Sequence, residues 1–165
     1  MSTLQTVADR IDIADLMARY ARAVDRCDAA LFDTVWAPGA IVDYGEGPED
    51  AAQWSLGLLG RLRAMERTQH ALSNSLVDLA GDHASAETMC TAYHQLTVDG
   101  QAQQMIVGGR YLDRLVRTRE GWRIAERRYV MDWNEIAPST CEIGSGRFAR
   151  FSRTGARAPD DPSYA

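Results

Sequence analysis

Lysine is absent from this chain of 165 residues, and all 18 of its basic residues are arginine. A lysine Schiff base and the lysine of a phosphate-binding loop are therefore excluded. Cysteine is scarce: Cys27, Cys90 and Cys141 are odd in number and widely spaced, so we expect reduced thiols and no zinc site. GxGxxG, HExxH and GxSxG motifs are also missing, which leaves nucleotide cofactors, zinc-protease chemistry and a hydrolase nucleophile without support. We expect neither a cofactor nor a metal.

Long apolar runs and an excess of positive charge are missing as well. No stretch approaches the roughly 20 apolar residues of a membrane span, and the N-terminal MSTLQTVADRIDIADL lacks the charge pattern of a signal peptide. The net charge is −5, with basic and acidic residues interspersed, unlike the basic surface of a nucleic-acid binder. We therefore expect a cytoplasmic protein without a membrane or nucleic-acid partner. The function classes that remain are acid/base chemistry on a small molecule and binding without catalysis.

Periodic apolar residues predict helices in the first part of the chain. A spacing of three and four residues over 6–24 is typical of an amphipathic helix with one buried stripe. Asp28 suits the N-cap of a second, short helix, and a third helix is predicted over 51–65, after a strand over 40–44. The stripe of the first helix comprises Val7, Ile11, Ala14, Met17, Ala21 and Val24; the second helix is expected to carry Leu31, Phe32, Val35 and Trp36.

The apolar period then changes from 3.6 residues to 2. Turn sequences separate four predicted strands, which span 68–79, 84–98, 104–118 and 122–132. Helices followed by an antiparallel meander predict an α+β fold, in which a strongly curved, mostly antiparallel sheet wraps around the helices and encloses a pocket. We expect this barrel domain over 1–136. The tail, 137–165, is expected to cross the surface or a subunit boundary.

The three histidines differ in their expected surroundings. His94 shares a strand face with Ala92 and other small or apolar residues, whereas the orientation of His70 stays open because both faces of its strand are nearly equally apolar. His83 lies in a turn and is expected to be solvated. The reference pKa of an imidazole, about 6.5, lies close to neutrality, so a histidine in an apolar wall suits general acid/base catalysis. A core histidine bonded to a backbone carbonyl is the alternative for His70 and His94.

Asp25 lies near the C-terminal end of the first predicted helix. The helix dipole disfavours an anion there by roughly 0.3–1 kcal/mol, so the carboxylate needs a partner. Arg22 or Arg26 on the surface would be one such partner, and an imidazole across the pocket would be another.

Three segments resemble the SnoaL-like branch of the nuclear transport factor 2-like superfamily. They are IADLMARYARAVDRCD, QHALSN and GRYLDRLVRTREGWRIAERR; the resemblance covers roughly residues 7–132 and extends to DPSY near the C-terminus. It implies a cone-shaped α+β barrel of cystatin-like topology. This fold hosts cyclases, dehydratases, isomerases, dioxygenase small subunits and binding modules.

Within this branch the chain is similar to three families of cofactor-independent lyases: hexachlorocyclohexane dehydrochlorinases, bile-acid 7α-dehydratases and scytalone dehydratases. The resemblance implies that His70 is a general base and that Asp25 orients it. Pocket tyrosines correspond to Tyr20 and Tyr44, which are expected to donate hydrogen bonds to a developing enolate oxygen. A second histidine corresponds to His94, which is expected to protonate the departing hydroxyl or to return a proton elsewhere on the substrate. A dehydrochlorinase arginine corresponds to Arg127, for which an exposed arginine paired on the strand is an equal interpretation.

The function expected from these residues is a dehydratase-type lyase, or an isomerase that uses the same proton abstraction. The substrate is expected to be a hydrophobic cyclic small molecule, similar to a steroid, terpenoid or polyketide. The alternatives are a non-catalytic binding module or structural subunit, and an aldol cyclase. We expect a homotrimer or homodimer formed through the outer face of the sheet. The residues expected to contact substrate, with core packing as the alternative role, are Arg127, Met17, Trp36, Trp54, Leu58, Met105 and Trp133.

Overall fold

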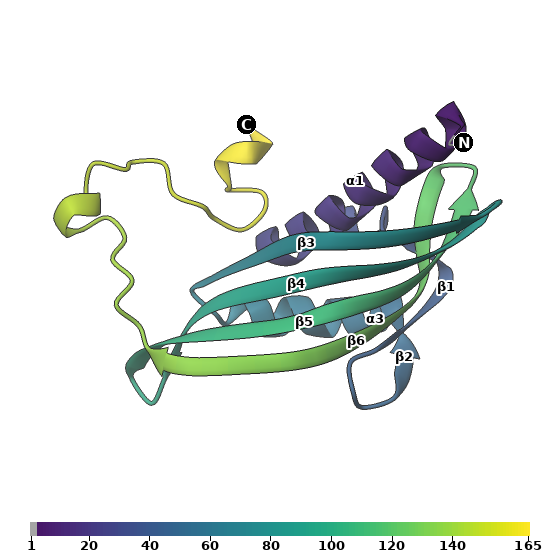
Figure 1. Cartoon of the computed structure of the whole chain (residues 1–165). Helices are drawn as coiled ribbons and strands as arrows, with labels where there is room; N and C mark the ends of the chain where they lie inside the picture. The colour runs from purple at the N-terminus through teal and green to yellow at the C-terminus, as the bar shows by residue number, and fades with distance from the viewer. Residues whose placement is uncertain (1–2) are drawn as a thin grey trace.

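Four long strands joined as an antiparallel meander form most of the molecule (Figure 1). The computed structural model describes residues 3–165. Its sheet has the order β2-β1-β6-β5-β4-β3, with β1 parallel to β6 and every other pair antiparallel. The predicted α+β fold with a curved, mostly antiparallel sheet is confirmed, and the sheet is not closed into a full barrel. The elements are α1 (Leu4–Arg26), α2 (Ala29–Phe32), β1 (Trp36–Asp43), β2 (Pro48–Asp50), α3 (Ala51–Arg63), β3 (Arg67–Ala80), β4 (His83–Val98), β5 (Gln101–Thr118) and β6 (Gly121–Pro138).

The second helix is shorter than predicted, and the first strand starts earlier. Asp28 caps α2 through Leu31 N–H, at 3.0 Å, but the helix ends after one turn at Phe32. Trp36, expected on this helix, instead begins β1 and pairs with Ile124 of β6. Pairing with a long neighbouring strand satisfies more backbone groups than a second turn of an isolated helix would.

The buried face of α1 coincides with the predicted stripe only in its C-terminal half, where Met17, Ala21 and Val24 are buried as predicted. Val7 and Ile11 are 47% and 57% exposed, and Ala14 is exposed too. The helix has a second apolar stripe that carries the larger Leu16 and Tyr20, and this stripe packs against the sheet. Larger side chains bury more apolar area, so they determine which face turns inward. The fully or nearly fully buried apolar residues of α1 are Ile13, Leu16, Met17, Tyr20, Ala21, Ala23 and Val24.

A bulge in β3 changes which side chains point inward. Asn74 has φ +39°, and the pairing of β3 with β4 shifts by one residue there. His70, before the bulge, pairs with Ala92 and points toward the helices; after the bulge Val77 is buried and Leu76 is 74% exposed. Strict alternation would place Leu76 on the same face as His70, but the bulge reverses the two faces of β3 beyond Asn74.

The alternation predicted for β4 is confirmed. One face of this strand is buried from Ala84 to His94 at every second residue, and most of this face belongs to the hydrophobic core. This face lies beside β3, and the candidate site lies between β3 and α1.

Candidate functional site

Asp25 and His70 form a close pair where the end of α1 meets the start of β3. The Asp25 Oδ1 atom lies 2.7 Å from His70 Nδ1, and Asp25 Oδ2 accepts the backbone N–H of His70 at 2.8 Å. Both side chains are nearly buried, with 13% and 9% exposed. A carboxylate only accepts hydrogen bonds, so Nδ1 carries the proton of the neutral imidazole. The Nε2 atom of His70 therefore has a free lone pair.

Of the partners considered for the Asp25 carboxylate, the structure places the imidazole of His70 against it. Arg26 pairs with Asp161 at 3.1 Å, and the imidazole of His70 is the group that contacts the Asp25 carboxylate. Two N–H donors from one residue offset the unfavourable position of an anion in the last turn of a helix. The pair is thus held by α1 on one side and by β3 on the other.

His94 lies next to this pair on the neighbouring strand. The rings of His70 and His94 are 5.7 Å apart and nearly perpendicular. His94 is buried, and its Nδ1–H donates a hydrogen bond of 3.3 Å to the Met105 carbonyl oxygen. Burial, and secondarily the charge of His70, lower the pKa of His94. His94 is consequently a neutral imidazole with Nε2 unprotonated near pH 7.

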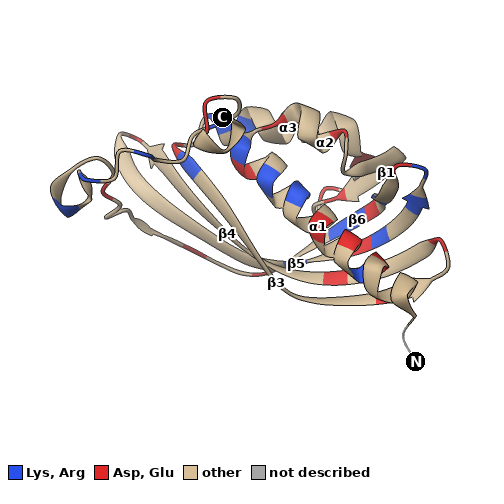
Figure 2. Cartoon of the chain, turned by 90° about the horizontal axis from the view of Figure 1, so that it is seen from above, with Lys and Arg blue, Asp and Glu red and all other residues tan. Residues whose placement is uncertain are grey.

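A cavity of about 720 Å³ lies beside the pair, between α1 and β3. Its apolar wall comes from alanines of α1 together with Met17 and Leu72, and Asp25 and His70 contribute to its lining. Arg22 and Ser163, from α1 and the tail, add polar groups. Figure 2 shows arginine bands on the C-terminal half of α1, close to the end of the chain. This combination suits an apolar molecule that carries polar substituents.

A second cluster lies deeper between the helices and the sheet. The hydroxyls of Tyr20 and Tyr44 are 2.7 Å apart. The guanidinium of Arg127 lies over the rings of Tyr20 and Tyr111, 4.0 and 3.9 Å from their centroids. Two bonds of 2.7 Å join Arg127 to the Asp113 carboxylate, and both side chains are fully buried. The equal alternative of an exposed arginine on the strand is therefore wrong for Arg127.

Burial controls the protonation of this cluster. It raises the pKa of the Tyr20 and Tyr44 hydroxyls above their ordinary value, so both stay protonated and able to donate. Burial also disfavours the Arg127 cation, but the charge and hydrogen bonds of Asp113 outweigh this effect and hold the pKa of Arg127 well above its usual value. Arg127 Nη2 contacts the Met17 sulfur at 3.3 Å, and Met17 lines the cavity. Met17 thus separates the cavity from the buried cation.

Apart from Trp133, the other residues predicted to contact substrate lie in three places. Trp36 and Trp54 surround the two tyrosines, and Trp54 stacks on Tyr44 with ring centroids 4.2 Å apart. Leu58 packs against the core from α3. Met105 pairs with His94 and so shares its face of the sheet.

Trp133 is not brought together with the other predicted residues. Its ring lies against Gly108, where a Cβ atom would come within 2.2 Å of it, and half of the residue is exposed. Trp133 pairs with Gly108, which pairs in turn with Thr91 on the face opposite to that of His94; the register of β6 against β5 shifts between Gly108 and Gly109. The bulge therefore turns Trp133 to the outer face of the sheet.

Sequence reasoning missed several residues around the site. Asp113 shares the inward face of β5 with Tyr111 and Leu115, and an acidic residue at an otherwise apolar position was the available signal. Arg157 and Ser163 were missed because the tail was expected to cross a surface. The dipeptide Asp161-Pro162 in DPSY is a turn signal that marked an ordered segment.

Two further observations concern the described residues, 3–165. No group of three or more His, Cys, Asp and Glu side chains among them is arranged to hold a metal ion. None of the described helices has the length and hydropathy needed to cross a membrane.

Residues 5–128 match a family model described as a SnoaL-like domain. The uncharacterised protein Rv2910c of Mycobacterium tuberculosis is 32% identical over 135 residues, which cover 77% of this chain and 88% of that protein. Hexachlorocyclohexane dehydrochlorinase LinA-type3 from Novosphingobium barchaimii LL02 is 19% identical with a TM-score of 0.71, covering 86% and 97% of the two chains. A candidate scytalone dehydratase from Novosphingobium aromaticivorans DSM 12444 is 18% identical with a TM-score of 0.70, covering 85% and 96%. The resemblance stated from the sequence is confirmed.

Proposed function

The chain belongs to the SnoaL-like domain family, and we propose that it is a cofactor-independent lyase that removes water from a hydrophobic cyclic small molecule. The family and its dehydrochlorinase and dehydratase neighbours support a small-molecule-modifying enzyme. The observation that carries the finer proposal is the Asp25 carboxylate, which accepts both N–H groups of His70 and leaves Nε2 unprotonated beside the cavity. A binding module has no need of a base oriented in this way.

In the proposed reaction, His70 Nε2 removes a proton from the substrate carbon next to a carbonyl group. The electrons of this C–H bond form the new double bond, and the hydroxyl on the neighbouring carbon leaves. The imidazolium gives its proton to the departing hydroxide, so water is released and His70 returns to its neutral form. Asp25 holds the tautomer and stabilises the imidazolium while it exists.

The other polar residues have supporting roles in this proposal. Tyr20 and Tyr44 share one hydrogen bond between them, so one hydroxyl proton stays free, but neither residue lines the cavity; in this proposal a developing enolate oxygen meets that proton only when the Met17 side chain moves aside. The buried Arg127 cation favours negative charge nearby, and one of its nitrogens, Nη1, has no hydrogen-bond partner among the described residues. His94 is neutral, so it is better suited to accept a hydrogen bond from a substrate hydroxyl than to act as the proton donor.

Steroid-, terpenoid- and polyketide-like alcohols are the substrates to test first, because the cavity wall is apolar. The purified protein is incubated with each compound in deuterated water, and mass spectrometry follows both loss of water and uptake of deuterium. A dehydratase gives the first signal, and an isomerase gives deuterium uptake without loss of water. Aldol cyclisation is recognised from a new ring in the product. Binding without any conversion of the panel would favour a non-catalytic module.

Substitution of the pair decides which residues carry the activity. We expect His70→Gln to lower turnover by about 10²–10⁴-fold, the usual contribution of a general base. We expect Asp25→Asn to lower kcat strongly as well, because an amide can stabilise the wrong tautomer. His83→Gln is the matched control, since His83 is exposed at the start of β4. Unchanged turnover in a folded His70→Gln variant would exclude His70 as the base.

A further inference from the structure

We propose that Arg157, in the tail, is a positioning residue for the Asp25–His70 pair. An effect of Arg157 on catalysis rests on the proposed function. The contacts by which Arg157 holds the Asp25–His70 pair do not depend on that function. The tail returns to the end of α1 and lies beside it (Figure 1). Its segment 155–164 contacts α1, and the Arg157 side chain donates a hydrogen bond to a carbonyl group in the last turn of this helix.

The guanidinium of Arg157 joins three elements that position the pair. Its Nη1 atom donates to the Asp25 carbonyl oxygen at 2.6 Å and to Thr68 Oγ1 at 2.7 Å. Its Nη2 atom donates to the Leu62 carbonyl at 2.8 Å and to the Met65 carbonyl at 3.3 Å. One side chain therefore ties the end of α1, the end of α3 and the start of β3 together.

These contacts act on both members of the pair from the backbone side. The last carbonyls of a helix lack partners within the helix, and the Asp25 carbonyl is one of them. A charged donor satisfies it and fixes the direction in which the Asp25 side chain leaves α1. Thr68 lies two residues before His70 and shares its strand face, so the bond to Thr68 fixes β3 at that point.

The DPSY sequence fastens the segment that carries Arg157. Asp161 accepts the backbone N–H groups of Ala156 and Ser163, at 2.9 and 3.0 Å, and pairs with Arg26. Hydrogen bonds from Ser163 and Ala156 hold the pKa of Asp161 well below its usual value, so the carboxylate stays charged.

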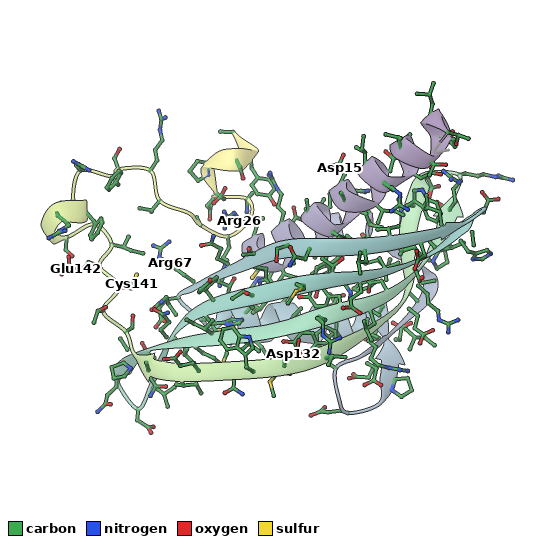
Figure 3. All side chains as sticks on the ribbon, viewed as in Figure 1. Asp15, Arg26, Arg67, Asp132, Cys141 and Glu142 are labelled. Carbon is green, nitrogen blue, oxygen red and sulfur yellow. The ribbon has the colours of Figure 1, made fainter. Side chains whose placement is uncertain are left out.

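Further contacts attach the same segment to α1 and β3. Tyr164 donates to Asp28 at 2.7 Å, and the Ala158 N–H donates to the Arg26 carbonyl at 2.7 Å. Arg67 donates to the Gly155 carbonyl at 2.7 Å, and Figure 3 shows Arg26 and Arg67 beside the tail. The segment is therefore anchored on both sides of Arg157, which makes the placement of its guanidinium well defined.

A residue that merely stabilises the fold would leave the pair unchanged in the folded protein, whereas a positioning residue would alter it. Nitrogen-15 NMR of the imidazole ring separates these cases, because it shows which ring nitrogen of His70 carries the proton. We expect the Nδ1-protonated form in the wild-type protein, as the contact with Asp25 requires. Asp25→Ala provides the reference for a pair that is lost, and His70→Gln assigns the signals.

The decisive variant is Arg157→Ala, measured at a pH above the titration of the imidazole. We expect His70 to shift from the Nδ1-protonated form toward the Nε2-protonated form, which is also the form expected for Asp25→Ala. Arg153→Ala is the matched control, because Arg153 lies exposed in the same tail, and it should leave the signals unchanged. Arg157→Lys keeps the charge but lacks the planar fork that makes four contacts, so it should show the same shift and serves if Arg157→Ala does not fold.

Wild-type ring signals of His70 in a folded Arg157→Ala or Arg157→Lys variant would overturn the inference, whatever happens to its unfolding temperature. The outcome is independent of the proposed reaction. A shifted tautomer in a protein that converts no compound of the panel would leave Arg157 as a positioning residue and remove the proposed function. If conversion is found, Arg157→Ala should lower kcat far more than it raises KM.

Discussion

His94 combines two features that make the stability of the fold depend on pH. Burial lowers its pKa from the ordinary 6.5, and the nearby charge of His70 acts in the same direction. The unfolded chain therefore binds a proton at His94 more readily than the folded protein does. The free energy of unfolding therefore rises with pH around the pKa of His94. As the pH falls from above 6.5 toward the lower pKa of the folded state, the contribution of neutral His94 to stability is lost.

Urea unfolding at a series of pH values tests this prediction. We expect the wild-type free energy of unfolding to fall between about pH 7.5 and 5.5, and His94→Gln to reduce that slope. His83→Gln should keep the wild-type slope, because His83 is exposed and its environment changes little on unfolding. Equal slopes in the wild-type and His94→Gln proteins would contradict the role assigned to His94.

At the level of single residues, the sequence and the resemblance did not contribute equally to the candidate site. Alternation in β4 placed His94 on the buried face, which the structure confirms. Periodicity left His70 undecided, and its contact with Asp25 was expected only from the resemblance. The Arg127–Asp113 pair joins residues that are 14 positions apart on neighbouring strands. Its recognition required the register of β5 and β6, which a bulge between Arg114 and Leu115 complicates.

Helix α1 shows why the orientation of an element is harder to predict than its existence. Two apolar stripes lie side by side on this helix, and the sequence pattern does not state which one faces the sheet. The structure buries Ile13 completely, whereas Ile11 is 57% exposed. Contacts with distant strands decide between the stripes, and these contacts are not visible in a local window.

Paired alanine substitutions distinguish the two orientations of α1. Ile13→Ala removes a fully buried side chain, and we expect it to lower the free energy of unfolding by about 2–5 kcal/mol. Ile11→Ala should change it by no more than about 0.5 kcal/mol, as is usual for an exposed position. Chemical denaturation monitored by tryptophan fluorescence gives both values. The reverse order of the two effects would mean that the stripe with Val7 and Ile11 is the buried one.

On the scale of the whole molecule, the outer face of the sheet remains uncovered by any described helix (Figure 1). The large side chains exposed there include Met89, Tyr93 and Trp133, which are 40%, 39% and 50% accessible. They lie on β4 and β6, on either side of β5, whose Arg110 forms ion pairs with Glu87 and Asp132 on the same face. Large exposed apolar side chains combined with charged groups are typical of an interface between subunits.

We expect this face to join two or three copies of the chain into a closed homo-oligomer. Sedimentation velocity of the wild-type protein should then give the mass of a dimer or trimer, and Trp133→Arg should lower it toward that of the monomer, because a charge buried in an interface is costly. Ile11→Arg is the matched comparison, since Ile11 is similarly exposed on α1, away from the sheet face. It should leave the assembly intact. Dissociation by Ile11→Arg but not by Trp133→Arg would move the interface to α1, and a monomeric wild-type protein would contradict the assembly itself.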